Sequence, residues 1–558
     1  MNNGVRAARR NKIGKLLRGV FGVERLRDGQ QQVIDSVLDG KDTLAIMPTG
    51  SGKSLCYQIP ARMLDGTTVM VSPLISLMKD QLEKLESLGI RAAQVNSSLN
   101  REEEEAALEG ICSTFHEIVF CTPERLSNPA FLDLLRQVKV ALVVIDEAHC
   151  ISRRGHALRP AYLEMAASID ALGKPPVLAL TATATDDVAA DIGKQLGRSR
   201  MHVVNTGIYR SNLHYAVVQV TNNDERYTRA RELLQAAQGV GIVYAATVKA
   251  AEELRDILEA AGESVTIYHG KLPAGERKVN QNLFMAGDKR IMVATNAFGM
   301  GIDKPDTRFV IHLQLPANLE AYCQESGRAG RDGADADCTL LYFQDDKRVQ
   351  QFFLVKHYPS ANDLKMLYDV VRGMAADTKP TSSTIEGEID ELASSKLKVC
   401  LKLLRDGKLL RQNRKLEYLV APGAPRAGLF DELAGRYAQK QERDREALEQ
   451  MVAYAVSGFC RWKMLLDYFN DEVEGFETCC KCDNCMNPPL VAEIAIRDDE
   501  FDHAAKEIEP AALFAPGARV KVPKFDAGTV RSVAADQVTI EFPDSSTRTF
   551  LADFVTPA

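Results

Sequence analysis

The sequence predicts two α/β domains in tandem, each built from a parallel β-sheet covered by helices, followed by smaller modules. Its 558 residues are enough for about three or four domains. Hydrophobic residues make up 45% and charged residues 26%, which is typical of globular chains. Between about residues 30 and 345, short β-rich runs alternate with amphipathic helical stretches. This alternation favours parallel sheets with helices on both faces.

The strands of the two sheets are expected where short apolar runs occur. In the first domain these runs are residues 43–47, 68–72, 118–121, 141–145 and 177–180. In the second domain they are residues 217–220, 241–244, 264–268, 291–294, 309–313 and 338–342. A break near residues 205–210 is the expected linker, so we predict one domain over residues 1–205 and the other over 206–345.

Three further modules and a linker are predicted after residue 345. Residues 346–425 contain helices and then a short hairpin, which is the pattern of a winged helix. Long charged helices between residues 429 and 469, followed by a cysteine cluster, indicate a helical metal-binding region over 426–490. Residues 491–512 are the expected acidic linker. Residues 513–558 are predicted to form a small β-barrel, with β-runs at 518–522, 528–533, 537–542 and 546–551.

The charge balance leaves any contact with nucleic acid to local patches. The chain has 69 basic and 76 acidic residues, a net charge of −7. No apolar run approaches the ~20 residues of a membrane-spanning helix, so we expect no membrane partner. The strongest basic patch lies between Ser394 and Lys415, and contact with a nucleic-acid backbone is favoured there over a merely solvated face. Its basic residues are Lys396, Lys398, Lys402, Arg405, Lys408, Arg411, Arg414 and Lys415.

Residues 47–54 have the pattern of a phosphate-binding loop between a strand and a helix. Glycines at positions 50 and 52 let backbone N–H groups turn toward phosphate oxygens. Thr49, Ser51, Lys53 and Ser54 complete the loop. The Lys53 ammonium is expected to neutralise the outer phosphates and the Ser54 hydroxyl to hold Mg²⁺. Met47 stands where the first glycine of the usual pattern would be.

Two further groups of polar residues complete the predicted site. Asp146 and Glu147 end an apolar strand, where Asp146 could reach Mg²⁺ and Glu147 could polarise the attacking water. In the second domain, Gln324 is followed by Arg328 and Arg331, three residues apart. We favour arginine fingers that act across the cleft over a solvated pair, because the first domain carries a nucleotide loop.

Taken together, the ordered motifs resemble those of RecQ-family ATP-dependent DNA helicases, from Phe21 to about Tyr342. The resemblance implies two RecA-like domains with ATP and Mg²⁺ between them and single-stranded DNA across their tops. It implies that Arg27 and Gln30 contact the adenine, and that Gln324, Arg328 and Arg331 complete the site. The motifs are residues 26–30, 47–54, 72–81, 122–125, 146–149, 181–184, 294–303 and 324–332.

The cysteine cluster is also similar to a RecQ feature, the zinc subdomain beyond the motor. Cys460, Cys479, Cys482 and Cys485 supply four soft ligands for Zn²⁺, which leaves Cys480 as the spare. Two disulfides are the alternative. The resemblance further implies 3′→5′ translocation, separation of duplex DNA, roles in DNA repair, recombination and the SOS response, and a cytoplasmic, nucleoid-associated location.

The chain departs from the family pattern in three places. The winged-helix-like segment precedes the zinc module, although the family usually places it after. The loop at residues 151–160 has Arg154 and Leu158 where relatives carry tryptophan and phenylalanine, and His156 and Arg159 are its expected DNA contacts. Lys402, Arg405 and Arg414 are the expected contacts in the basic segment. The terminal barrel resembles Tudor- or SH3-like modules, and its protein partner is not predicted.

Two other functions remain open from the sequence. An RNA-unwinding motor would use the same core, but the residues after the Asp146–His149 motif and the zinc module favour a DNA helicase. The second is a nucleotide-gated DNA-binding scaffold that unwinds weakly, which the altered loop makes conceivable. The intact Glu147 and Arg328 argue against it.

Overall fold

The structure is a computed structural model. It describes residues 3–97, 99–113, 115–152, 162, 165–298, 304–374, 380–389, 392, 394–413, 417–423, 425–488, 517–521, 527–534, 537–542, 547–551 and 556–557. The chain divides into two compact units, Met1–Pro489 and Leu490–Ala558, which are described separately.

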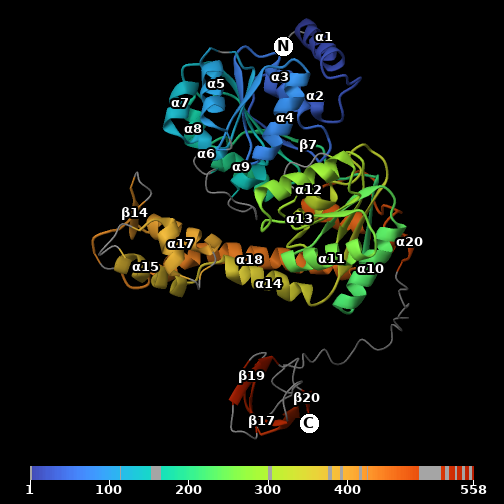
Figure 1. The fold of residues 1–558 in the computed structure, drawn as a ribbon, viewed down its shortest axis with the longest axis vertical. Helices are drawn as coiled ribbons and strands as arrows, with labels where there is room; N and C mark the ends of the chain where they lie inside the picture. Colours follow the sequence, from blue (N-terminus) through green and yellow to red (C-terminus); the bar gives the residue numbers. More distant parts are fainter. Residues whose placement is uncertain are drawn as a thin grey trace, which may run out of the picture. The chain divides into compact units, whose positions relative to one another are not determined.

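The first sheet is wholly parallel, with the strand order β3-β4-β2-β5-β6-β1-β7 (Figure 1). Its strands are β1 (Thr43–Ile46), β2 (Thr67–Val71), β3 (Ala92–Val95), β4 (Ile118–Cys121), β5 (Val140–Ile145), β6 (Val177–Thr181) and β7 (His202–Asn205). Successive residues of β5 enter opposite cores: Val143 and Ile145 pack in one, and Leu142 and Val144 pack in the other. Both faces are therefore buried, as the continuous apolar runs predicted.

Helices cover both faces of this sheet. They are α1 (Asn3–Gly19), α2 (Gln30–Leu38), α3 (Leu55–Ala61), α4 (Ile75–Ser87), α5 (Arg101–Cys112), α6 (Pro123–Leu126), α7 (Pro129–Leu135), the 3₁₀ turn η1 (Ala148–Ile151), α8 (Met165–Ala171) and α9 (Asp186–Gln195). Strands β3 and β7 were not predicted. Both lie at the edges of the sheet, and β7 buries only Val204, so neither forms a strongly apolar run.

The second sheet is also wholly parallel, in the order β10-β11-β9-β12-β13-β8. Its strands are β8 (Leu213–Gln219), β9 (Val240–Tyr244), β10 (Val265–Tyr268), β11 (Ile291–Ala294), β12 (Thr307–His312) and β13 (Ala336–Tyr342). The helices are α10 (Asn223–Ala236), α11 (Val248–Ala260), α12 (Ala274–Ala286) and α13 (Leu319–Ser326). The Asn318 side chain caps α13 by accepting a hydrogen bond from the Ala321 N–H at 2.8 Å. The predicted pair of α/β domains is confirmed.

The rest of the first unit is mainly helical. It comprises α14 (Asp346–His357), α15 (Ala361–Met374), α16 (Ser382–Glu388), α17 (Ser394–Asp406), the hairpin β14 (Leu410–Gln412) and β15 (Tyr418–Val420), α18 (Leu429–Val456), α19 (Arg461–Phe469) and α20 (Asp483–Met486). The long helix α18 joins two cores (Figure 1). Leu433 near its start packs with α15 and α17, whereas Leu448 and Met451 pack with the second sheet. The module boundary at residue 426 stays a prediction.

The second unit contains five antiparallel strands in the order β19-β18-β17-β16-β20. They are β16 (Arg519–Lys521), β17 (Gly528–Ala534), β18 (Gln537–Glu541), β19 (Thr547–Leu551) and β20 (Thr556–Pro557). Val530 and Ile540 are buried between them. The small all-β module is thus present, and its closure into a barrel stays a prediction. The predicted acidic linker lies outside the described residues.

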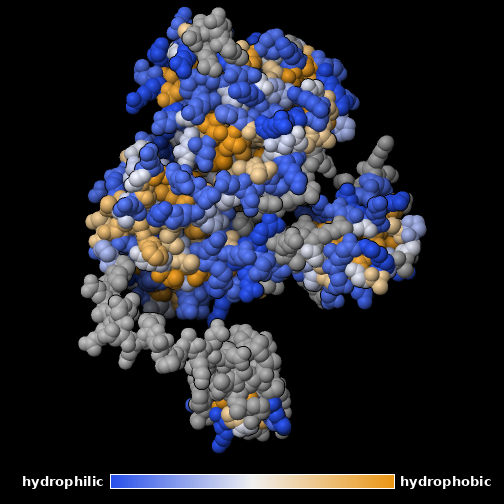
Figure 2. Space-filling model, turned by 180° about the vertical axis from the view of Figure 1, so that it is seen from behind, coloured by the Kyte–Doolittle hydropathy of each residue, from blue (hydrophilic) through white to orange (hydrophobic). Residues whose placement is uncertain are grey.

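The surface is mostly polar on the face that Figure 2 draws, where hydrophobic residues gather in separate patches among hydrophilic ones. Phe459 and Met486, near the cysteine cluster, are among the exposed large apolar side chains. Within the described ranges, no helix has both the length and the apolar character needed to cross a membrane.

Candidate nucleotide site and zinc site

A cavity of about 410 Å³ lies between the phosphate loop after β1 and the segment that follows α13. Residues of both α/β domains line it, so the cavity lies between the two domains. The predicted site residues at its wall are Arg27, Thr49, Gly50, Gly52, Lys53, Ser54, Asp146, Glu147, Gln324, Arg328 and Arg331. The structure therefore brings together side chains that are separated by up to about 300 positions in the sequence.

Gln30 supports the phosphate loop from behind. Its amide nitrogen donates to the Ser51 and Gly52 carbonyl oxygens, both at 2.9 Å, and its own carbonyl accepts from the Arg27 N–H at 2.8 Å. A Cβ at position 52 would lie 2.6 Å from that amide nitrogen, and Gly52 has a φ of 80°. Only glycine allows this approach without strain. The Arg27 guanidinium donates to the Gly50 carbonyl.

Lys53 lies at the floor of the cavity. Its Nζ donates to the Met47 and Pro48 carbonyl oxygens at 2.9 and 3.2 Å. Burial lowers the pKa of Lys53, and the nearby carboxylates of Glu147 and Asp146 partly oppose this effect. The Met47 side chain is fully buried in the core beside Cys56, away from the phosphate loop. Only the backbone of Met47 faces Lys53, so a methionine fits at this position.

The two carboxylates lie directly after β5. Asp146 is buried and accepts from the Ser72 hydroxyl at 3.3 Å, while Tyr162 donates to its backbone oxygen at 3.2 Å. Burial, and then the adjacent Glu147 carboxylate, raise the pKa of Asp146 to about 7. Glu147 has a left-handed φ of 49° and lies 3.4 Å from His149 Nδ1. A paired set of carboxylates beside a buried lysine suits a divalent cation bound to phosphate.

The arginines come from the second domain, in the segment between α13 and β13. Arg331 packs against the phosphate loop, since a Cβ on Gly50 would lie 3.1 Å from its Cγ. Arg328 is buried and lines the same wall as Gln324. Their segment is held by Arg210, whose guanidinium donates to the carbonyl oxygens of Gly327 at 2.9 Å and Ala329 at 2.8 Å. The cavity is therefore cationic on both walls and suits a polyphosphate.

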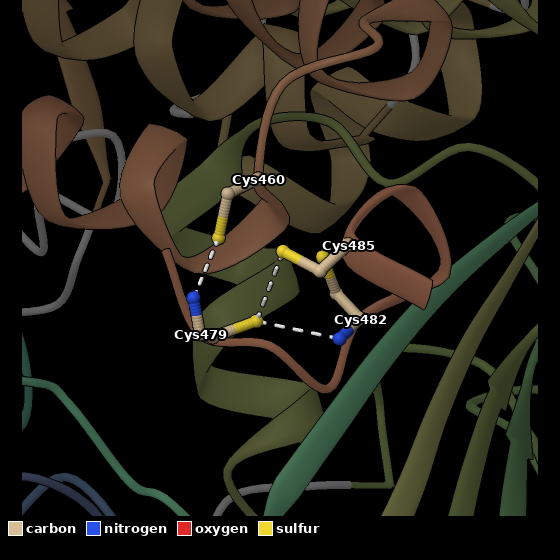
Figure 3. Close-up of side chains that lie close together, drawn as sticks. All are labelled: Cys460, Cys479, Cys482 and Cys485. Atoms are coloured by element: carbon tan, nitrogen blue, oxygen red, sulfur yellow. Dashed lines mark hydrogen bonds between the residues drawn. The ribbon is translucent and has the colours of Figure 1, made fainter. Parts of the chain in front are cut away.

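The four predicted zinc ligands form one cluster (Figure 3). The sulfur atoms of Cys460, Cys479, Cys482 and Cys485 all lie within 4.8 Å of one another, and those of Cys479 and Cys485 are 3.9 Å apart. Four thiolates around one zinc at 2.3 Å would place their sulfurs about 3.8 Å apart, so the cluster fits a closed structural zinc site. All four residues are free cysteines, so the disulfide alternative is wrong.

Backbone and ionic contacts support this cluster. The Cys479 N–H donates to Cys460 Sγ at 3.2 Å, and the Cys482 N–H donates to Cys479 Sγ at 3.3 Å. Arg461 is buried and binds the Asp483 carboxylate through Nε at 2.9 Å and Nη2 at 3.0 Å. Cys480 is exposed and has a left-handed φ of 54°, so its side chain lies outside the cluster.

Comparison with known proteins agrees with these two sites. Three family models match the chain: the DEAD/DEAH box helicase over residues 27–192, the helicase conserved C-terminal domain over 225–333, and the RecQ zinc-binding model over 414–486. An ATP-dependent DNA helicase RecQ from Synechocystis is 32% identical over 496 residues, which cover 86% of this chain and 99% of that protein. The chain belongs to the RecQ family.

Other relatives of this RecQ-family chain cover less of it. The RecQ helicase of Bacillus subtilis is 43% identical over 65% of the chain, and the match spans 62% of that protein's length. Among solved structures, the Mycobacterium smegmatis helicase Lhr bound to single-stranded DNA and AMP-PNP has a TM-score of 0.51 and 21% identity, and covers 76% of this chain and 62% of that protein. This likeness supports the fold of the RecQ-family chain.

Of the predicted DNA contacts of the RecQ-family chain, Lys402 and Arg405 lie within the described residues. His156 and Arg159 lie outside the described residues, as do Arg154 and Arg414. Arg405 is exposed at the end of α17 and donates to Gln412 at 2.8 Å, and Lys402 is half-buried. Lys396, counted in the basic patch, pairs with Asp363 at 2.6 Å, so it contributes less free charge than expected.

Three residues around the nucleotide cavity were given no role by the sequence. Ser72 ends the strand next to β5, and the rule that sites form at carboxyl ends of parallel strands could have suggested it. Tyr162 follows the altered loop and has no motif of its own. Arg210 lies in the linker between the domains, where no local pattern predicts its partners.

Proposed function

We propose that the protein is an ATP-dependent DNA helicase that moves 3′→5′ on single-stranded DNA and separates duplex DNA. One observation carries the proposal: the phosphate loop and the carboxylates belong to the first α/β domain, and the arginines on the same cavity belong to the second. A nucleotide bound between two such domains is coupled to their separation, because its contacts exist only when the cleft is closed.

The residue roles follow from this arrangement. Lys53 and the loop amides would neutralise the outer phosphates of ATP, and Ser54 with Asp146 would hold Mg²⁺. Glu147 would accept a proton from the attacking water, and Arg328 and Arg331 would stabilise the charge that develops on the phosphoryl group. Gln324 would complete the site beside these two arginines. Arg27 would contact the adenine, and Gln30 would hold the phosphate loop beside it.

DNA is the proposed track because the relatives are named DNA helicases and the zinc module accompanies them. Single-stranded DNA would cross the tops of the two α/β domains. The basic segment between Ser394 and Lys415 would bind the phosphates of duplex DNA. RNA unwinding and a non-unwinding scaffold are less favoured. A nucleoid-associated location in the cytoplasm and a role in DNA repair, recombination and the SOS response complete the proposal.

A strand-displacement assay on a duplex with a 3′ single-stranded tail tests this function. The wild-type protein should release the labelled strand only with ATP and Mg²⁺, and a 5′-tailed duplex should stay intact. Lys53→Ala should lower turnover by orders of magnitude, whereas Glu147→Gln should still bind ATP without hydrolysing it.

The matched control is Lys139→Ala, because Lys139 is exposed and pairs with Asp65 at the surface. It should unwind as well as the wild type. Wild-type turnover in either site variant would reject the assigned site, and ATP hydrolysis without displacement of any strand would favour the scaffold.

A further inference from the structure

The linker between the two sheets is held by the segment that follows α19. Residues 206–212 join β7 to β8, and Ile208 in this linker is buried. The Asp471 carboxylate accepts a hydrogen bond from the Ile208 N–H at 2.6 Å. A Cβ at position 207 would lie 2.7 Å from the same carboxylate, so Gly207 allows the close approach.

The zinc module also contacts each of the two domains. Asn470, next to Asp471, donates from Nδ2 to the Asp186 carboxylate at 2.9 Å, and Asp186 is the first residue of α9 in the first domain. Tyr468 donates to the Glu320 carboxylate at 2.6 Å on α13 of the second domain. Lys481, between the zinc ligands, donates to the Ser211 carbonyl at 3.1 Å.

Another residue of the same linker contacts the nucleotide site. Arg210 holds the segment that carries Arg328 through the Gly327 and Ala329 carbonyl oxygens. The linker therefore contacts both the zinc module and the arginine segment. Any displacement of Ile208 and Arg210 would move the arginines relative to Lys53.

We propose that Asp471 is a positioning residue that holds the linker, assisted by Asn470, so that the two walls of the nucleotide cavity stay in register. The zinc module then acts on ATP hydrolysis through the linker, in addition to any contact with DNA. This inference rests on the proposed helicase function. Because the phosphate loop belongs to the first domain alone, loss of the restraint should lower kcat more than it changes the KM for ATP.

Two substitutions at position 471 distinguish the loss of this hydrogen bond from a general disturbance of the fold. Asp471→Ala removes the acceptor for the Ile208 N–H, whereas Asp471→Asn keeps an oxygen of the same shape. We expect Asp471→Ala to lower kcat by about tenfold and Asp471→Asn to stay within about twofold of the wild type, because the amide oxygen of asparagine can still accept from the Ile208 N–H. Asn470→Gly should keep the left-handed backbone, where φ is 56°, and lose the bond to Asp186 with a smaller effect.

A second readout is independent of hydrolysis. Dyes attached through unnatural amino acids at Lys194 and Lys249, both exposed and on different domains, report the separation of the domains by energy transfer. The distance distribution should broaden in Asp471→Ala and stay narrow in Asp471→Asn. Asp467→Ala is the control, because Asp467 lies on α19, four residues before Asp471, and pairs with Lys463.

Zinc content must remain at the wild-type level in Asp471→Ala for the expected result to hold. A wild-type distance distribution in this variant would overturn the proposal, and so would zinc loss with equal defects in both variants at position 471. Absence of hydrolysis in the wild-type protein would instead reject the proposed function, and the distance measurement would still decide the role of Asp471.

Discussion

Arg210 donates a hydrogen bond from Nη1 to the Gly327 carbonyl at 2.9 Å, across 117 positions of the chain. A second bond from Nη2 reaches Ala329 at 2.8 Å. The arginine is mostly buried, and desolvation lowers its pKa from the usual value. An unpaired buried guanidinium would be costly, so these carbonyl partners keep the arginine segment in a fixed position.

Replacing Arg210 should therefore impair hydrolysis without abolishing nucleotide binding. Arg210→Ala should lower kcat by about 10- to 100-fold, since three bonds to the arginine segment, at Gly327, Ala329 and Gly330, are lost. Steady-state ATPase and the affinity for a fluorescent ATP analogue would be measured together. Arg229→Ala, an exposed arginine that pairs with Glu232, should behave as the wild type. An Arg210→Ala enzyme with normal kcat would contradict this positioning role.

The zinc cluster gives a second prediction. Cys482→Ser should release zinc and lower the free energy of unfolding, because Cys482 is fully buried among the other three ligands. Cys480→Ser should retain about one zinc per chain, since Cys480 is exposed outside the cluster. Metal analysis and thermal unfolding of both variants check this. Zinc retained in Cys482→Ser would reject the ligand set.

The basic segment between Ser394 and Lys415 gives a third prediction. Replacing Lys402, Arg405 and Arg414 together should weaken duplex binding and reduce the slope of log affinity against log salt by up to about three, because each phosphate contact contributes about 0.9. Basal ATPase should remain. Lys396→Ala offers a contrast, since Lys396 is tied to Asp363 and its loss should lower stability more than DNA affinity. An unchanged salt slope in the triple variant would mean that another surface grips duplex DNA.

The fourth prediction concerns the loop at residues 151–160, most of which lies outside the described residues. An aromatic side chain stacked on a base contributes ~1–3 kcal/mol, and an arginine recovers part of this by stacking or pairing with phosphate. Arg154→Trp should raise DNA stimulation of ATPase, and Arg154→Ala should lower it. Wild-type stimulation in both variants, over a range of DNA concentrations, would show that this loop is not the DNA sensor here.

The fold was largely predictable because both sheets are buried on two faces and their strands form apolar runs. The edge strands β3 and β7 were missed because neither is a strongly apolar run: β7 exposes most of its side chains, and β3 is two alanines, a glutamine and a valine. The phosphate loop was found despite Met47, and the structure shows that only the backbone of this residue is needed there.

Contacts between residues far apart in the chain account for the features that could not be predicted from the sequence. Lys396 was counted as free positive charge, but it lies opposite Asp363, which is 33 positions earlier in the chain. Ser72 supports the nucleotide site by donating to Asp146, which follows the neighbouring strand β5. Arg210 supports it by donating to Gly327, which lies 117 positions later in the chain. Such pairings depend on how the sheets are connected, and no local pattern records them.

Trp462 is the single tryptophan of the chain. Its indole N–H donates to the Leu213 carbonyl at 3.1 Å, and its ring contacts those of Tyr209 and Tyr215, with centroids 5.0 Å apart in each pair. Indole fluorescence therefore arises from one place, where the zinc module meets the end of the linker and the first residues of β8. Trp462 is therefore an intrinsic fluorescent probe, and its emission reports changes at this junction during nucleotide or DNA titration without any added dye.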